Sequence, residues 1–319
     1  MEEHANNRGT HPREPLIALL LSVLAPGLGH IYCGKPAKGL VLFFLGFVFV
    51  PIMVFCPQNV SSAFILTAIL ASIILLIAVF FYAVVDAWFL AERIDEHYEV
   101  KKYNQWYLYV LVIIISLSYP PVMSYSIRQS LIQAYVMAAG SMLPNLMVKD
   151  YVILNKTAYR HRLPEIGDVI AFRPPNDRNR IYVKRIVALP GDTIEVKGNI
   201  LYINDMPLQY RKVAPLKYMK VSPDSSSVIE SGTAGEIVEE IRSNTSYRIQ
   251  LINSSGANSS ADFAKTTVPD TYFFVLGDNR ANSLDSRHFG PVPLADILGK
   301  VDFIYLPAGS WSRFGRFPQ

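Results

Sequence analysis

The sequence of 319 residues has only two cysteines, Cys33 and Cys56, and both lie in an apolar first part of the chain. The polar part that follows therefore has no cysteine for a disulfide framework or for a cysteine-based metal site. The six histidines are scattered without the spacing of metal ligands, which argues against zinc chemistry. We expect neither a metal nor another cofactor.

Blocks of like charge are also absent. The formal net charge is +4, and lysine and arginine form no run. Proteins that bind nucleic acid usually carry a basic patch, so we expect no nucleic-acid partner. Charge is scarce from Leu16 to Tyr125, and it reaches the density of an ordinary soluble protein only from about residue 126 onward. This shift predicts a membrane domain over residues 1–125 and a polar domain over residues 126–319.

The first domain contains four apolar stretches. They are residues 16–32, 39–55, 63–90 and 106–123. About 20 residues of helix cross a bilayer, so the third stretch is long enough and the second and fourth just suffice. The first is short and is interrupted by Pro26, Gly27 and Gly29, so a re-entrant hairpin is an alternative to a crossing. Further apolar stretches follow directly without a small-residue cleavage site, so we expect no cleavable signal peptide here.

The loops between these stretches predict the orientation of a multi-pass protein. The loop between the third and fourth stretches carries Arg93, Lys101 and Lys102, whereas the loop at residues 56–62 carries no charge. Positive loops stay in the cytoplasm, so the last apolar stretch runs outward and everything after Tyr125 is extracytoplasmic. The predicted location is the plasma (inner) membrane, with the lipid bilayer as a partner.

The N-terminus conflicts with four full crossings. Such crossings would put Arg8 and Arg13 outside while Lys35 and Lys38 stay inside. A re-entrant first stretch brings both basic groups to the cytoplasmic side, and it is the reading that we prefer.

The polar domain reads as mainly antiparallel β structure. Its runs rich in Val, Ile, Tyr and Phe, bounded by Gly, Pro, Asn and Asp, are "DYVILNK", "GDVIAFR", "RIYVKRIVAL", "DTIEVKGNILYIN", "TYFFVLGD" and "GKVDFIYL". From about residue 210 to 269 the pattern dissolves into Ser, Asn, Gly and Ala. We interpret that part as a variable insertion with little weight in the chemistry. The predicted fold class is thus α-helical membrane segments followed by a mainly antiparallel β domain.

Three short segments stand out against this β background. They are "GSMLPNL" at 140–146, "YVKRIVALPGD" at 182–192 and "GDNRANSLDSRHFGPVP" at 277–293. The first offers the hydroxyl of Ser141 and the second offers Lys184 within an apolar strand, where alternation puts it on one face with Tyr182 and Ile186.

A serine hydroxyl is a weak nucleophile until a neighbouring base removes its proton. In the polar domain only His161 and His288 could supply an imidazole, and neither lies in a recognisable triad context. A lysine can serve instead if burial keeps it neutral. Taken singly, a strand lysine is usually a surface residue and a Gly-Ser pair is usually a turn. The third segment alone could be a polar loop with an Asp285–Arg287 ion pair, but the three segments in one chain favour a serine/lysine site.

The three segments, in this order and behind membrane stretches, resemble the type I signal peptidases of peptidase family S26. These are membrane serine proteases that remove signal peptides from exported preproteins. The resemblance runs from "IRQSLIQAY" to Val301–Tyr305 outside the insertion, and the spacing "GDNRxxSxDSRxxG" is intact. It implies preproteins as substrates, with small residues at the first and third positions before the cut.

The resemblance also implies a role for each matching residue. Ser141 would be the nucleophile, Lys184 the general base and Ser283 the residue that orients this lysine. Met142 and Pro144 match residues that shape the turn of the nucleophile. Five further matches would brace the site through hydrogen bonds and ion pairs, namely Asp278, Arg280, Asp285, Ser286 and Arg287.

Three positions depart from the pattern of that family. Asn145 stands where threonine is usual, and Ala188 stands where glycine is common. Ala139 stands where many members have glycine or a hydroxyl residue that can donate to the oxyanion. The oxyanion hole would then depend on backbone N–H groups, chiefly that of Ser141, and turnover would be slower.

Two other functions compete with this interpretation. A catalytically impaired membrane scaffold or binding protein that retains the peptidase fold is supported by Ala139. A self-cleaving serine/lysine protease of the repressor type would share the β domain, but the membrane stretches and the lack of a helix-turn-helix argue against it. The segment "LAPGLGHIYCGKPAKGL" resembles small membrane modules of unclear role.

Overall fold

The computed structural model describes residues 13–54, 62–94, 98–198, 200–221, 228–242, 245–252, 262–316 and 318. Cys56, Arg8 and most of the uncharged loop at 56–62 lie outside these residues, so the predictions made on them are not addressed. The chain divides into two compact units, Met1–Ile127 and Arg128–Gln319.

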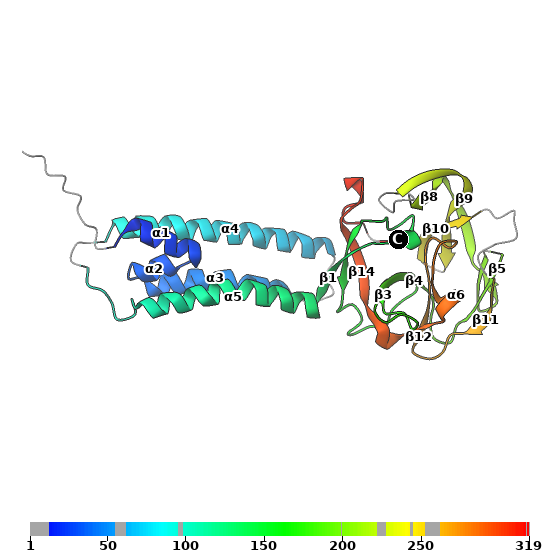
Figure 1. Ribbon diagram of the computed structural model, residues 1–319, viewed down its shortest axis with the longest axis horizontal. Coiled ribbons are helices and arrows are strands. Elements are labelled where there is room, and N and C mark those ends of the chain that lie inside the picture. Colours follow the sequence, from blue (N-terminus) through cyan, green and yellow to red (C-terminus); the bar gives the residue numbers. More distant parts are fainter. Residues whose placement is uncertain are drawn as a thin grey trace, which may run out of the picture. The chain divides into compact units, whose positions relative to one another are not determined.

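The first unit is helical. Its helices are α1 (Pro15–Leu24), α2 (Leu28–Tyr32), α3 (Pro36–Val54), α4 (Ser62–Glu92) and α5 (Trp106–Ser130) (Figure 1). Prolines begin α1 and α3, where the missing N–H is not needed. Between α1 and α2 the chain turns at Gly27, whose φ of +90° is a left-handed conformation that favours glycine.

Small residues let these helices approach closely. A Cβ on Gly29 of α2 would lie 2.1 Å from the carbonyl oxygen of Ala18 in α1, so only glycine fits there. On α4 the fully buried Ala83, Ala87 and Ala91 recur once per turn, and Ala87 and Ala91 form one cluster with Ala18. Close packing through small side chains is typical of helices in membranes.

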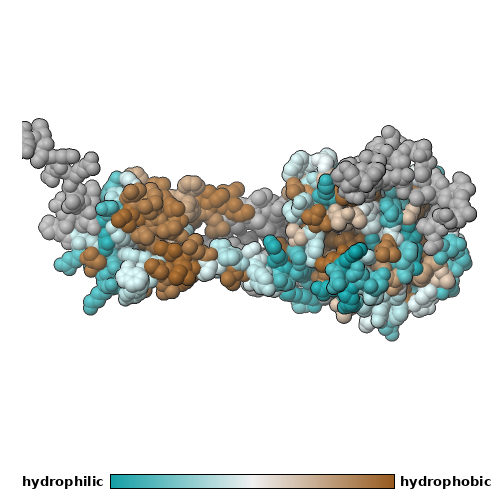
Figure 2. Space-filling view, in the orientation of Figure 1, coloured by the Kyte–Doolittle hydropathy of each residue, from teal (hydrophilic) through white to brown (hydrophobic). Residues whose placement is uncertain are grey.

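The side chains exposed on these helices are mostly apolar, as the brown surface over the first unit in Figure 2 shows. Within the described residues, two helices are long and apolar enough to cross a bilayer by length and composition: α4 over Ile73–Glu92, and α5. Two shorter apolar helices cover Pro15–Leu24 and Pro36–Leu45. With its 10 residues α1 is about 15 Å long, half of a bilayer core, so it does not cross by itself.

The segment before α1 and two interhelical connections meet at one end of this unit. The guanidinium carbon of Arg13 lies 4.3 Å from the centre of the Tyr32 ring and 5.3 Å from that of Tyr98. The hydroxyl of Tyr103, in the α4–α5 connection, donates to the carbonyl oxygen of Gly34, which lies between α2 and α3. Helices α1 and α2 thus bring the chain back to the end of this unit where it began.

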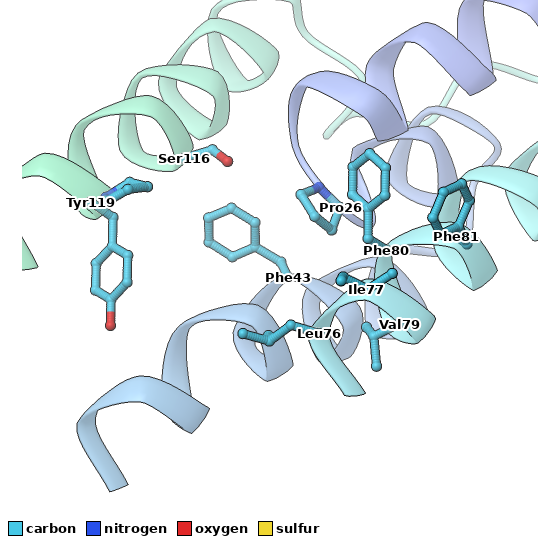
Figure 3. A pocket seen from close by; sticks show the side chains of 10 residues that line it. Pro26, Phe43, Leu76, Ile77, Val79, Phe80, Phe81, Ser116 and Tyr119 are labelled. Carbon is cyan, nitrogen blue, oxygen red and sulfur yellow. The ribbon is translucent and has the colours of Figure 1, made fainter. Parts of the chain in front are cut away.

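Helices α3, α4 and α5 also border an apolar pocket of about 350 Å³. Figure 3 shows Phe43 of α3, Leu76 and Phe80 of α4 and Tyr119 of α5 around it, with Pro26 from the turn after α1. Its lining is almost entirely hydrocarbon, which suits a position within a membrane.

The described residues of the second unit form three antiparallel sheets. The largest has the order β1-β2-β14-β3-β4-β12-β13, the second β11-β5-β6-β7 and the third β10-β9-β8. The strands of the first sheet are β1 (Ile132–Val136), β2 (Tyr151–Asn155), β3 (Val169–Phe172), β4 (Tyr182–Ala188), β12 (Tyr272–Leu276), β13 (Val292–Pro293) and β14 (Ile297–Leu306). Those of the second are β5 (Thr193–Lys197), β6 (Ile200–Ile203), β7 (Met206–Pro207) and β11 (Phe263–Thr267). All six β runs expected from the sequence form strands, and the predicted fold class is confirmed.

Residues 210–269, which we interpreted as an insertion because the β pattern dissolves there, nevertheless contain strands. This segment contains the third sheet, formed by β8 (Gln209–Val221), β9 (Val228–Arg242) and β10 (Thr245–Ile252). Its sequence shows little alternation, but the strands pair in register over most of their length. Backbone pairing between neighbours stabilises strands whose own side-chain pattern is weak.

Candidate active site

Ser141 lies in the connection between β1 and β2. The antiparallel pairing of β1 with β2 continues one residue beyond both strands. There the N–H of Met137 donates to the carbonyl oxygen of Asp150 at 2.8 Å. Beyond it, Gly140–Met142 form a single 3-10 turn, η1. The side chains of Met142, Leu143 and Leu146 are fully buried and anchor the connection in the core. Ser141 itself stays half-buried, so its hydroxyl is held at the surface by rigid surroundings.

Lys184 comes from β4, which lies between β3 and β12 in the middle of the large sheet. Its side chain is only 4% exposed. The Nζ atom donates a hydrogen bond to Ser141 Oγ at 2.6 Å and lies 5.8 Å from the centre of the Tyr182 ring. The fold therefore brings together the hydroxyl and the amine that the sequence put forward as a pair.

Burial has a direct effect on this amine. Loss of hydration lowers the pKa of Lys184 from 10.5 to about 8. The negative charges of Asp285 and Asp278 oppose this change, and the positive charge of Arg287 adds to it. A large fraction of the amine is thus neutral in weakly alkaline solution, as a general base requires.

The third sequence segment forms a loop and the short helix α6 (Ser286–Phe289) after β12. Asp285 is fully buried, accepts a hydrogen bond from the N–H of Gly277 at 3.0 Å and forms an ion pair with Arg287 at 2.9 Å. Burial alone would raise the pKa of Asp285, but the hydrogen bonds and charge of Arg287 hold it below its ordinary value. Ser286 Oγ accepts from the N–H of Val275, so the loop is fastened to β12.

Asp278 links this loop to the strand of the lysine. Its carboxylate binds Nε and Nη2 of Arg185, each at 2.7 Å, and both side chains are at most 2% exposed. It also accepts from Asn145 Nδ2 at 2.6 Å, and the same amide group donates to the carbonyl oxygen of Arg248. Asn145 is therefore a structural partner of Asp278. The sequence analysis gave Arg185 no role. Its charge, on the face of the apolar strand β4 opposite to that of Lys184, could have indicated a buried ion pair.

Arg280 has a partner from the third sheet. Its Nη1 and Nη2 atoms bind the two carboxylate oxygens of Glu240 in β9, each at 2.7 Å. Glu240 is fully buried and also accepts from the hydroxyl of Tyr247 in β10. The segment interpreted as an insertion thus contributes the counter-ion of a residue in the motif. Nothing local in the sequence around Glu240 signalled this role.

Asn279 contacts the nucleophile turn directly. Its backbone N–H donates to the carbonyl oxygen of Ser141 and its Nδ2 to that of Gly140, both at 3.0 Å. The side chain is 2% exposed. Sequence reasoning gave it no role, although it is the third residue of the "GDNR" motif.

Ser283 packs against the same turn without reaching the lysine. Its Oγ atom is buried and makes no hydrogen bond to Lys184. The Ser283 side chain instead helps to hold the pKa of Asp285 below its ordinary value. A Cβ on Gly277 would lie 2.2 Å from this Oγ and 2.6 Å from the carbonyl oxygen of Ser141, so Gly277 packs directly against the side chain of Ser283 and the backbone of Ser141. Orientation of Lys184 by Ser283 stays a prediction.

The remaining expected residues shape the turn. Ala139 precedes η1 in an extended conformation and is exposed, while Pro144 is half-buried and follows a cis peptide bond. Across the described ranges, no group of three or more His, Cys, Asp or Glu side chains could hold a metal ion. The arrangement suits nucleophilic catalysis by the Ser141 hydroxyl, with the amine of Lys184 as the base.

Comparison with known proteins agrees with this chemistry. A sequence model of a family described as "Signal peptidase, peptidase S26" matches residues 103–306. A probable signal peptidase I-1 of Synechocystis is 30% identical over 56% of this chain and 74% of its own. Signal peptidase I of Bacillus caldolyticus is 31% identical over 65% of this chain and 92% of its own. A solved signal peptidase I of Enterococcus faecalis is 29% identical over 44% of this chain and 97% of its own, with a TM-score of 0.26.

Proposed function

The chain belongs to the signal peptidase family S26, and from this premise we propose that Ser141 and Lys184 are its catalytic pair. The protein is a serine endopeptidase that removes signal peptides from preproteins. The observation that carries the assignment of residues is the hydrogen bond of 2.6 Å between Ser141 Oγ and the buried Nζ of Lys184. The lowered pKa of this amine supports its role as a base.

In the proposed reaction the neutral Nζ of Lys184 takes the proton of the Ser141 hydroxyl while Oγ attacks the carbonyl carbon of the scissile bond. The tetrahedral intermediate collapses as the C–N bond breaks, and the proton on Nζ passes to the leaving amine. The product bearing the new N-terminus departs, and an ester links the signal peptide to Oγ. Lys184 then deprotonates a water molecule that attacks this ester, and the Oγ atom leaves and recovers a proton.

The oxyanion formed in both steps needs hydrogen-bond donors. We assign the backbone N–H of Ser141 to this task, because Ala139 offers no hydroxyl. The loop that fixes Ser141 and surrounds Lys184 is itself held in shape by five residues, namely Asp278, Arg280, Asp285, Ser286 and Arg287. The support for this assignment is the set of buried contacts that these residues make with one another, with Arg185 and with Glu240, together with the hydrogen bond from Asn279 of the same loop to Gly140.

The substrate is proposed to bind as an added strand. Within the described residues β1 pairs with β2 alone, so its other edge is free, and the exposed Ala138 and Ala139 continue from it toward Ser141. An extended segment could pair with such an edge through its backbone. Shallow pockets there would favour small residues at the first and third positions before the cut.

Membrane attachment of the family fits a substrate whose signal peptide lies in the bilayer, because anchoring both partners raises their effective concentration. We further propose several passes, with the basic connections in the cytoplasm and the β unit outside. The first apolar stretch is then a re-entrant hairpin, supported by the short α1 and by the stacking of Arg13 on Tyr32 and Tyr98.

Cleavage by the purified full-length chain tests the proposal. A preprotein with a small-x-small site should be cut, and Ser141→Ala and Lys184→Ala should each reduce kcat to background. Ser310→Ala and Lys212→Ala, which remove an exposed serine and an exposed lysine, are the matched controls and should leave the rate unchanged. Cleavage that persists in Lys184→Ala would disprove the proposed base. If the unaltered chain bound the preprotein without cutting it, the impaired scaffold would be the correct function.

A further inference from the structure

Arg13 of the helical unit is a buried cation, and two of its three guanidinium nitrogens lack a hydrogen-bond partner among the described residues. Its side chain is 9% exposed, and its Nε and Nη2 atoms have no hydrogen-bond partner within the described part of the chain. Burying a guanidinium costs free energy unless its N–H groups and its charge are compensated. Arg13 therefore differs from Arg185, Arg280 and Arg287, each of which binds a carboxylate.

The unused atoms lie on one edge of the guanidinium group. Arg185 uses the same two atoms to bind both oxygens of Asp278, and Arg287 uses them to bind Asp285. This edge presents two parallel N–H donors to a planar pair of oxygens, such as those of a carboxylate or a phosphate. The rings of Tyr32 and Tyr98 lie close to the guanidinium carbon, at 4.3 Å and 5.3 Å from their centres, and neither ring gives the buried Nε and Nη2 atoms a hydrogen-bond acceptor.

Neighbouring groups extend the polar site. The hydroxyl of Tyr109 and the Oδ1 atom of Asn104 are also buried and unpartnered within the described residues. Tyr109 lies beside Tyr32, with ring centres 6.4 Å apart, and Asn104 Nδ2 donates to the carbonyl oxygen of Tyr32. Several polar groups with free hydrogen-bonding capacity thus gather around one tyrosine at the end of α2.

The position of this site selects the class of ligand. It lies where α1 begins, α2 ends and the α4–α5 connection passes, at one end of the helical unit (Figure 1). The exposed apolar side chains of Leu16 and Leu20 follow in α1, and the exposed Trp106 begins α5. The nearby exposed ammonium of Lys35 adds positive charge. A ligand that combines an anionic head with apolar chains matches these surroundings, whereas a free anion would use only the polar part.

We propose that the Nε and Nη2 edge of Arg13, between Tyr32 and Tyr98, binds the phosphate of an anionic phospholipid. The bound lipid completes the hydrogen bonds of the guanidinium and ties the segment before α1 to the α4–α5 connection. This site rests on the membrane character of the helical unit and is independent of the peptidase chemistry.

Thermal unfolding of the full-length chain in neutral detergent tests the proposal. Short-chain phosphatidylglycerol should raise Tm in a saturable way, because a ligand that binds only the folded state stabilises it. Phosphatidylcholine of the same chain length and inorganic phosphate should have much smaller effects. In Arg13→Gln the concentration of phosphatidylglycerol that gives half of the shift should rise at least tenfold. Arg93→Gln, the same change at an exposed arginine of this unit, is the matched control and should change it less than twofold.

Any of the following results would overturn the proposal. An equal response of Arg13→Gln and the unaltered chain would leave Arg13 a structural cation stacked on two tyrosines. An equal response to phosphatidylcholine would assign the effect to the acyl chains, and a full response to inorganic phosphate would assign the site to a free anion. Should Arg13→Gln not fold, Arg13→Lys keeps the charge but lacks the paired N–H edge. Native mass spectrometry should then show one tightly bound phosphatidylglycerol fewer in Arg13→Lys, and equal numbers would refute the proposal.

Discussion

At the scale of single residues, the amine of Lys184 governs how the rate depends on pH. Its pKa of about 8 is lower than that of an ordinary lysine because the side chain is buried. Only the neutral amine can accept the Ser141 proton, so kcat/KM should rise with pH and level off above an apparent pKa near 8. Below that value it should fall about tenfold per pH unit, to roughly 1% of the plateau at pH 6. Initial rates on a peptide substrate from pH 5 to 10 measure this profile, and a rate that stays flat down to pH 5 would contradict it.

Ala139 is the second residue with a measurable effect. A hydroxyl at this exposed position could donate to the oxyanion, a contact that is often worth a factor of 100 or more. We expect Ala139→Ser to raise kcat by about 10-fold to 100-fold with little change in KM, because the donor acts mainly in the transition state. Ala138→Ser adds the same hydroxyl to the neighbouring exposed residue and should have no such effect. Equal rates for both variants would mean that the serine at 139 does not reach the oxyanion.

At the scale of elements, the third sheet braces the catalytic loop through the ion pair of Glu240 and Arg280. Both side chains are buried, at 0% and 6% exposure, so Glu240→Gln leaves a buried guanidinium without its counter-ion. We expect a loss of about 3 to 5 kcal/mol in the free energy of unfolding. For a unit of this size that loss lowers Tm on the order of 10 °C, which calorimetry can measure.

Two variants decide whether the missing charge is the cause. Glu240→Gln combined with Arg280→Gln leaves no unpaired charge and should recover much of the lost Tm. Glu239→Gln removes the neighbouring carboxylate, which pairs with an exposed arginine, and should cost less than about 1 kcal/mol. A double variant as unstable as Glu240→Gln would show that the packing of Glu240, and not its charge, supports the loop.

The sequence located those site residues whose reactive side chains lie in short recognisable motifs. Ser141, Lys184 and the residues of the third segment could be located because they lie in short motifs with fixed spacing. Five of the seven strands of the large sheet, β2, β3, β4, β12 and β14, could be predicted because runs of apolar residues bounded by turn residues mark them. Glu240 could not be found, since its role depends on a contact between β9 and a loop far along the chain. Asn279 acts largely through backbone geometry, which a residue type alone does not reveal.

At the scale of the whole molecule, the first apolar stretch decides on which side of the membrane the N-terminus lies. If it is re-entrant, Glu14 and the basic connections share the cytoplasmic side. With Cys33 and Cys56 replaced by alanine, a cysteine introduced at Glu14 should react with an impermeant maleimide only after the membrane is opened. A cysteine at the exposed Ser310 of the β unit should react in intact spheroplasts. Labelling of position 14 in intact spheroplasts would establish a full crossing instead.

The brace that Asn279 provides has a consequence for the newly made chain. Asn279 is 139 residues further along the sequence than Gly140, whose carbonyl oxygen it binds. During translation the ribosome has therefore produced the serine and the lysine long before it produces this loop. Until this loop is made, the turn of Ser141 lacks the two hydrogen bonds that Asn279 donates to it. The proposed protease should therefore become competent only after nearly the whole β unit has been synthesised.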